Sequence, residues 1–175
     1  AGFTFAQEKT VKEAKSIANE VNPDFNKAEQ LINQALTNPE TKDNADTWDV
    51  AGFIQKRINE KQMENAYLRK PYDTLKAYNS ILKMYEYFLK CDELAEIPNE
   101  KGKVKNKYRK ANAASMMVER PNLINGGIQY FNLNKSGEAL KFFGTYVESA
   151  SYPMLEKENL AVTDTLLPQI AYYAT

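Results

Sequence analysis

The sequence predicts an all-α fold in which the helices pair as hairpins. Apolar residues recur every three to four positions over most of the chain, which is the period of a helix with one buried face. Pro and Asn-Pro steps separate these periodic segments and indicate short connections. No segment of useful length shows the alternation of polar and apolar residues that is typical of a β-strand.

Two helices are expected in the first part of the chain. The first carries an apolar stripe over residues 11–21 and ends at residues 22–23, which are Asn-Pro. Asp24 is placed to cap the next helix, because a short acidic side chain accepts hydrogen bonds from the free amides of a first turn. The second helix has its apolar residues within residues 28–36 and ends before Pro39.

Two further helices are expected in the middle of the chain. The third has an apolar stripe over residues 48–58, and this pattern fades through the charged residues 59–64. Pro71 opens a long fourth helix, since proline is favoured in a first helical turn. The stripe of this helix covers residues 75–89 and includes several tyrosine and leucine residues.

The rest of the chain is expected to form four helices. The fifth carries a stripe over residues 108–117, and Pro121 starts or kinks the sixth, because its ring disrupts a helix interior. The seventh spans residues 137–149, with Ser136 as its cap. The eighth begins near residues 163–164.

The composition argues against catalysis. With 23 basic and 23 acidic residues, the chain has no net charge to attract nucleic acid or an anionic membrane. It has no histidine, which removes the usual serine and cysteine catalytic sets and the commonest transition-metal ligand. Cys91, the single cysteine, is expected to be a small half-buried residue. We therefore expect no enzyme activity, no catalytic or metal site and no cofactor, and no stretch is apolar enough to span a membrane.

A string of five residues predicts one close helix pair. Leu123, Gly127 and Tyr130 share one face of a helix, and Ala139 and Phe143 begin the next helix. A small residue on each helix lets the two backbones approach, while the large apolar residues fill the space beside the crossing. Similar spacing occurs earlier in the chain, where the expected packing residues are Ala28, Trp48 and Gly52.

This spacing resembles the tetratricopeptide-repeat family, whose unit is an antiparallel helix hairpin of about 34 residues that stacks on copies of itself. The resemblance implies a right-handed stack of hairpins that serves as a scaffold for a protein or peptide partner. Gln55 and Tyr146 depart from the family pattern, which has an aromatic and a small residue at these positions. Gly52 and Gly127 are more than two repeats apart, so an insertion is expected near residues 59–70.

The resemblance also predicts how the chain is divided. Three hairpins are expected over about residues 8–38, 44–96 and 103–150, and residues 159–175 start a further repeat. Together they form one helical repeat domain, residues 7–175. The last segment is apolar, whereas the final helix of a repeat stack usually has a polar outer face. We therefore expect a longer chain, or another molecule that covers this end.

Residues 1–6 are predicted to be the remnant of a secretory signal. They are apolar, a charged run follows them, and the small residues Thr4 and Ala6 stand where a signal peptidase reads its substrate. With this start, the chain is similar to the divergent envelope-associated or secreted tetratricopeptide proteins of bacteria. A periplasmic or secreted location is therefore expected.

The resemblance implies a partner-binding surface on the concave face of the stack. In the family this face is lined by helix residues beside the small position. Charged and apolar side chains hold these places here: Asp49, Phe53, Lys56, Arg57, Ile124, Ile128, Phe131 and Asn132. Family members that clamp a peptide carboxylate use Lys and Asn at such places, so a carboxylate clamp is not expected. Alternatively, Ile124, Ile128 and Phe131 pack on the next helix.

Two other functions remain as alternatives. The chain has eight Phe, eleven Tyr and one Trp, which could stack on sugar rings in a glycan-binding protein, and an exposed aromatic cluster on one rim would favour this function. The basic run of residues 101–110 contains no acidic residue and could contact the phosphates of a nucleic acid, with Tyr108 stacked on a base.

Overall fold

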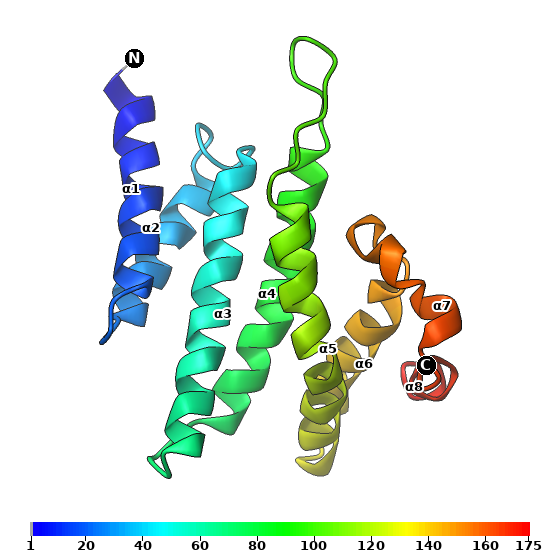
Figure 1. Ribbon diagram of the computed structural model, residues 1–175. Helices are drawn as coiled ribbons and strands as arrows, with labels where there is room; N and C mark the ends of the chain where they lie inside the picture. Colours follow the sequence, from blue (N-terminus) through cyan, green and yellow to red (C-terminus); the bar gives the residue numbers. More distant parts are fainter. Residues whose placement is uncertain (1) are drawn as a thin grey trace.

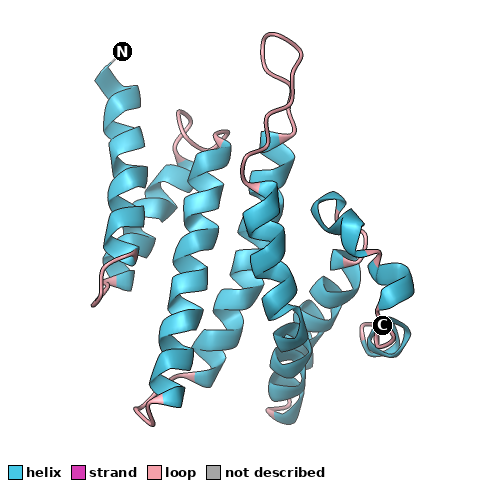
Figure 2. Cartoon of the chain, viewed as in Figure 1, coloured by secondary structure: helices cyan, strands magenta, loops and turns pink. Residues whose placement is uncertain are grey.

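The computed structural model describes the backbone of residues 2–175 and the side chains of residues 5–175, and all regular elements in that part are helical (Figure 2). The elements in chain order are α1 (Gly2–Ala18), α2 (Phe25–Thr37), α3 (Ala45–Tyr67), α4 (Thr74–Ala95), α5 (Arg109–Asn132), α6 (Ser136–Ser149), the 3-10 helix η1 (Pro153–Glu158), α7 (Leu160–Thr163) and α8 (Leu167–Tyr173). The prediction of an all-α fold is confirmed.

The helices follow one another across the molecule, so that the two ends of the chain lie on opposite sides (Figure 1). Each of α1 to α5 packs on the next helix along the chain, and α8 packs on α6. Helices α1, α3 and α5 lie in a front layer, and α2, α4 and α6 lie behind them (Figure 1). Between layer neighbours, α1 contacts α3 and α4 contacts α6 at a few residues. The repeat architecture itself remains a prediction.

Short polar side chains set the starts of α2 and α4. Asp24 accepts a hydrogen bond from the amide of Lys27 at 3.0 Å, as expected for the cap of α2. Asp73 caps α4 in the same way, through the amide of Lys76 at 2.9 Å. Helix α4 therefore begins at Thr74, after the turn that contains Pro71, and not at the proline itself.

Helix α3 continues through the charged stretch at which its pattern fades. It extends to Tyr67, so most of the insertion expected near residues 59–70 is helix. Asn59 is buried, and its amide donates to the carbonyl of Ala77 on α4 at 3.1 Å. The outer side of this stretch carries an ion pair between Lys61 and Glu64 at 3.1 Å. The apolar stripe is weaker here because the polar residue Asn59 stands at the contact with α4, where an apolar residue would continue the pattern.

Helix α5 is a single helix, and the prediction of two separate helices around Pro121 is wrong. Proline lies inside the helix and removes one hydrogen bond. Met116 and Leu123, on either side of it, are both fully buried in the core. This packing holds both halves of the helix in place, which outweighs the lost bond.

The C-terminal part contains more short elements than expected. Helix α6 starts at Ser136 after the flanking residue Lys135, so Ser136 is the first helical residue and not the cap. The 3-10 helix η1 and helix α7 then precede α8, which begins at Leu167, a few residues later than predicted. The left-handed conformation of Asn159, with φ of 49°, separates η1 from α7.

The buried apolar side chains form two clusters. One joins α1, α2 and α3, and the other joins α4, α5, α6 and the C-terminal elements. The ring of Phe88, a member of the second cluster, lies against Gly52 of α3 and so connects the two. Because each cluster uses side chains of consecutive helices, the order of the helices in space follows their order in the sequence.

Glycines allow aromatic rings to reach the helix backbone at these contacts. A Cβ atom built on Gly52 would overlap the ring of Phe88, and one built on Gly127 would overlap the ring of Phe143. Gly126 is placed in the same way against a neighbouring ring of α6. Gly52 and Gly127 were predicted to let two backbones approach, and what occupies the space beside each of them is an aromatic ring of the paired helix.

The residues predicted for helix packing are nearly all buried. Trp48 is the half-buried one, and its indole N–H donates to the carbonyl of Lys42 at 2.7 Å. Its ring meets the ring of Tyr87 edge to face, at a centroid distance of 5.9 Å. The buried residues of this set are Ala28, Gly52, Leu123, Gly127, Tyr130, Ala139 and Phe143.

Residue 1 and the side chains of residues 2–4 lie outside the described part of the chain, so the signal remnant expected over residues 1–6 falls partly outside it. The backbone is helical from Gly2, and helix α1 therefore begins before the predicted domain start at residue 7. In the part that the structure describes, no helix is both long and apolar enough to cross a membrane.

Candidate functional site

Three of the predicted partner-binding residues meet in one hollow of about 340 Å³, which we call the α3–α5 hollow. Asp49, Phe53 and Lys56 of α3 form one wall. The other lining residues come from the first turn of α3, from α1 and α4, and from the segment that starts α5: Asp46, Lys15, Phe88, Lys107, Tyr108, Ala111, Asn112 and Ser115.

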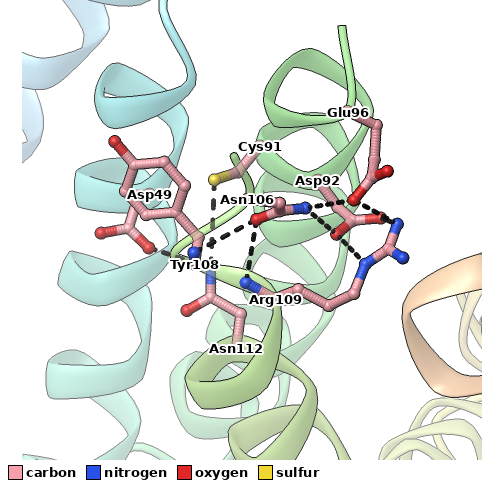
Figure 3. Close-up of polar contacts among 8 residues, drawn as sticks. All are labelled: Asp49, Cys91, Asp92, Glu96, Asn106, Tyr108, Arg109 and Asn112. Carbon is pink, nitrogen blue, oxygen red and sulfur yellow. Dashed lines mark hydrogen bonds and ion pairs between the residues drawn. The ribbon is translucent and has the colours of Figure 1, made fainter. Parts of the chain in front are cut away.

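A polar cluster fixes the start of α5, which forms the opposite wall of the hollow (Figure 3). Arg109 donates to both carboxylate oxygens of Asp92 on α4, at 2.7 and 2.8 Å, and lies 3.0 Å from Glu96. The amide of Asn106 donates to the same two carboxylates, at 2.7 and 2.9 Å. The paired geometry of the guanidinium and Asp92 sets the orientation of α5 as well as its position.

Asn106 also closes the turn that leads into α5, two residues before the N-cap Tyr108. Its side-chain oxygen accepts hydrogen bonds from the amides of Tyr108 and Arg109, at 3.2 and 3.0 Å (Figure 3). One side chain therefore satisfies two free amides at the start of the helix and joins that turn to α4. This arrangement holds Tyr108 at the mouth of the hollow.

Asn112 connects α5 to α3 at the back of the hollow. Its side-chain amide donates to Asp49 at 2.9 Å and lies 3.9 Å from the sulfur of Cys91 (Figure 3). Burial raises the pKa of Asp49, although the hydrogen bond from Asn112 and the charges of Lys15 and Lys107 oppose this effect. The Asp49 carboxylate is therefore bound by a neutral donor, and the nearby lysines are not in direct contact with it.

Lysine side chains cover the aromatic rings of the hollow. The ammonium of Lys15 lies 5.6 Å from the ring centre of Phe53, and that of Lys107 lies 5.2 Å from the ring centre of Tyr108. The Tyr108 hydroxyl donates to Asp46 at 3.3 Å. Burial, followed by the charge of Asp46, raises the pKa of Tyr108, which therefore stays a phenol.

Arg57 lies outside the hollow and takes part in the contact between α3 and α1. Its side chain donates to the carbonyl of Ala18 at 3.3 Å and to Glu60 at 2.8 Å. Lys56 lies 3.8 Å from the same Glu60 and remains a lining residue of the hollow. Of the two cations predicted for partner binding, only Lys56 lines the hollow.

The other predicted residues lie at a second, apolar hollow between α5, α6 and α8. This α5–α8 hollow has a volume of about 480 Å³, and Phe131 at its edge is 63% exposed. Its lining residues are Ile124, Ile128, Phe131, Phe143, Leu166, Gln169, Ile170 and Tyr173. Asn132 is exposed at the end of α5. The predicted concave face is thus divided between two places.

Sequence reasoning missed Lys15 and Asn112 and placed Lys107 only in the basic run of residues 101–110. The fold brings these three residues together. Lys15 lies on the exposed side of α1 and gives no signal by itself. Asn112 is buried within the apolar stripe of α5. A polar residue within such a stripe is a usable signal, because a buried amide needs a partner.

The basic run of residues 101–110 does not form one surface. Arg109 binds Asp92, and Tyr108 turns toward Asp46 in the hollow. Lys101, Lys103 and Lys105 remain exposed in the loop between α4 and α5, which extends beyond the helix ends (Figure 1).

Within the described residues, no group of three or more acidic or cysteine side chains is arranged to hold a metal ion. Cys91 is buried, and burial raises its pKa, so its sulfur stays protonated at neutral pH. No protein-family model, curated protein or solved structure matches this chain. The proposed role therefore rests on the residues and on the geometry of the hollow.

Proposed function

We propose that this chain is a non-catalytic helical scaffold that binds a segment of a partner protein in the α3–α5 hollow. The observation that supports this most is the convergence of Asp49, Phe53 and Lys56 with residues of α1 and the start of α5. The polar cluster around Asp92 fixes the α5 wall of the hollow, and the hydrogen bond from Asn112 to Asp49 joins this wall to α3. The hollow is thus held in place before a partner binds, which lowers the entropic cost of binding.

The hollow offers groups that suit a peptide with mixed chemistry. Its carboxylates accept hydrogen bonds from neutral donors, Asn112 and Tyr108. Within the described residues, Lys15 has no ion-pair partner, so it can bind an acidic group of the peptide. The ring of Phe53 supplies apolar contact. A peptide that carries a carboxylate near an apolar side chain matches this arrangement.

The repeat architecture and the location belong to the same proposal. The close contacts of Gly52 and Gly127 with rings of the paired helices support a stack of hairpins similar to tetratricopeptide repeats. The secreted or periplasmic location is proposed from the apolar start of the chain. We propose no catalytic activity because histidine is absent from the sequence.

The two alternatives have less support. One face of each ring in the hollow, Phe53 and Tyr108, is covered by a lysine, which leaves less room for a stacked sugar. The exposed tyrosines fall in two separate places and do not form one cluster: Tyr67 and Tyr72 at the turn between α3 and α4, and Tyr172 and Tyr173 at the end of α8. For nucleic acid, the lysines of the loop remain, but the aromatic residue expected to stack on a base points into the hollow.

Photocrosslinking tests the proposal. A benzoylphenylalanine at Lys107, on the rim of the hollow, should capture a defined protein partner in extracts of the native cells. The same group at Tyr67, which is 88% exposed at the far end of α3, is the control and should not capture it.

Adding Lys56→Glu to the Lys107 probe should lower the crosslinking yield several-fold, because it reverses a charge on the wall of the hollow. Lys9→Glu, an exposed change on α1, should leave the yield unchanged. Equal capture from both probe positions, or a yield that Lys56→Glu does not change, would count against the hollow as the binding site.

A further inference from the structure

A second surface lies between α4 and α6, on the other layer of the molecule from the α3–α5 hollow. Helices α4 and α6 both pack on α5 and barely contact each other. The space between them is a groove of about 600 Å³, which we call the α4–α6 groove. Its apolar floor includes Leu82, Leu89 and Leu140, and Leu140 is 43% exposed.

Gly144 distinguishes this groove from a gap left by ordinary packing between helices. It lies in the middle of α6, where glycine weakens a helix relative to alanine. The buried glycines Gly52, Gly126 and Gly127 have a packing reason, since an aromatic ring occupies the place of their side chains. A Cβ atom on Gly144 would meet nothing within 4 Å. The missing side chain at Gly144 therefore does nothing for the internal packing, and it leaves the groove open.

The rim of the groove carries more negative than positive charge. Three carboxylates, those of Glu86, Glu93 and Glu148, face two ammonium groups, those of Lys90 and Lys141. Lys90 pairs with Glu93 at 3.3 Å. Among the described residues, Glu86 and Glu148 have no ion-pair partner, and one lies on each side of the groove.

The pKa of Tyr152, at one end of the groove, also reflects the negative charge of these carboxylates. Burial raises its pKa to about 12, and the charges of Glu148 and Glu93 add to this effect. A basic group that enters the groove would offset these carboxylates, whereas an acidic one would be repelled.

We propose that the α4–α6 groove binds a segment of a partner protein in which an apolar side chain is flanked by Lys or Arg residues. The apolar side chain lies over Gly144 between Leu89 and Leu140, and the basic groups pair with Glu86 and Glu148. This site is independent of the α3–α5 hollow, and its occupant has the opposite charge preference.

The test is selection from a display library of random short peptides on the purified full chain. Wild type should enrich peptides that combine apolar and basic residues, and raising the salt concentration should weaken their binding. Gly144→Trp, which fills the groove, should weaken the selected peptides about tenfold or more. Gly137→Trp is the matched control, because Gly137 is exposed at the start of the same helix and also has open space around it.

A second variant keeps the test valid if the tryptophan disturbs folding. The double change Glu86→Lys and Glu148→Lys alters only exposed charges and should weaken the same peptides by a similar factor. Glu20→Lys, an exposed change at the end of α1, should have no effect. Circular dichroism of each variant shows whether its helix content is kept.

Several outcomes would overturn the proposal. The first is that no selected peptide binds wild type more tightly than Gly144→Trp. The second is that the selected peptides are acidic. The third is that the peptides lose binding to Lys56→Glu but still bind Gly144→Trp. A dimer of this chain that Gly144→Trp dissociates would show that the occupant is a second copy and not a basic partner segment.

Discussion

Gly52 and Gly144 lie in the middle of helices, but in opposite surroundings. The ring of Phe88 occupies the place of a side chain at Gly52, whereas open space surrounds the position at Gly144. The same residue type therefore has a packing role in α3 and no packing role in α6. The sequence alone does not distinguish the two, because each lies next to a phenylalanine, Phe53 or Phe143, within a helical segment.

Alanine at these two positions should have opposite effects on stability. Gly52→Ala forces a shift of Phe88 and should lower the free energy of unfolding by about 1–3 kcal/mol. Gly144→Ala should raise it by about 1 kcal/mol, because alanine is the better helix former. Urea denaturation of both variants measures these values. A neutral Gly52→Ala would contradict the close packing of the two helices.

Arg120 and Asp164 form a buried ion pair that ties the segment before α8 to α5. Their side chains are 6% and 9% exposed. Arg120 also donates to the hydroxyl of Ser149 and to the carbonyl of Tyr146, both at 3.0 Å. The Tyr146 hydroxyl donates to Asp164 at 2.6 Å. Removing one member leaves a buried charge without its partner, which costs about 3–5 kcal/mol.

Acid should weaken this pair. Burial by itself would raise the pKa of Asp164, but the hydrogen bonds from Tyr146 and Arg120 lower it below its ordinary value. A carboxyl group whose pKa is lowered in the folded protein stabilises the fold at pH values above its ordinary pKa of about 3.9. This stabilisation is lost as the pH falls through the pKa that the group has in the folded protein.

Asp164→Asn should therefore be less stable than wild type at neutral pH, and the difference should shrink below about pH 4. Denaturant unfolding at a series of pH values gives this comparison directly. Ser151→Ala, an exposed change in the same region, is the control. A difference between Asp164→Asn and wild type that is the same at all pH values would show that the charge of Asp164 is not what stabilises the segment.

At the scale of the element, the start of α5 depends on Asn106. This side chain accepts hydrogen bonds from the amides of Tyr108 and Arg109 and donates to Asp92 and Glu96 at the end of α4. Asn106→Ala should lower the free energy of unfolding by about 1–2 kcal/mol and speed amide exchange in the first turn of α5.

Asn99 provides a matched control in the same loop. Its side chain accepts hydrogen bonds from the amides of Lys101 and Lys103, both at 3.0 Å, in an exposed turn. Asn99→Ala should therefore change the exchange of the loop and leave α5 unaffected. Faster exchange at the start of α5 in both variants would mean that the loop as a whole, and not the hydrogen bonds of Asn106, positions this helix.

The sequence was most informative where local rules decide the structure. The periodic stripes located most of the helices, and Asp24 was correctly identified as the cap of α2. The rules failed where tertiary contacts override them. Pro121 does not end α5, because Met116 and Leu123 are buried on both sides of it. The charged end of α3 stays helical, because Asn59 bonds α4.

At the scale of the whole molecule, the candidate site could be predicted only in part. One helix supplies Asp49, Phe53 and Lys56 at helical spacing, so a pattern within one segment could identify them. Lys15 and Lys107 are far from them in the sequence and reach the hollow only through the packing of α1 and α5. The separation of Ile128 and Phe131 into the α5–α8 hollow likewise depends on where α8 packs.

The most direct test of the proposed function is hydrogen–deuterium exchange of the chain, alone and bound to the partner captured through the Lys107 probe. We predict slower exchange in the middle of α3, on the facing part of α1 and in the first turns of α5, with little change in α8. Protection confined to α8 and the end of α5, with α3 unchanged, would contradict binding in the α3–α5 hollow.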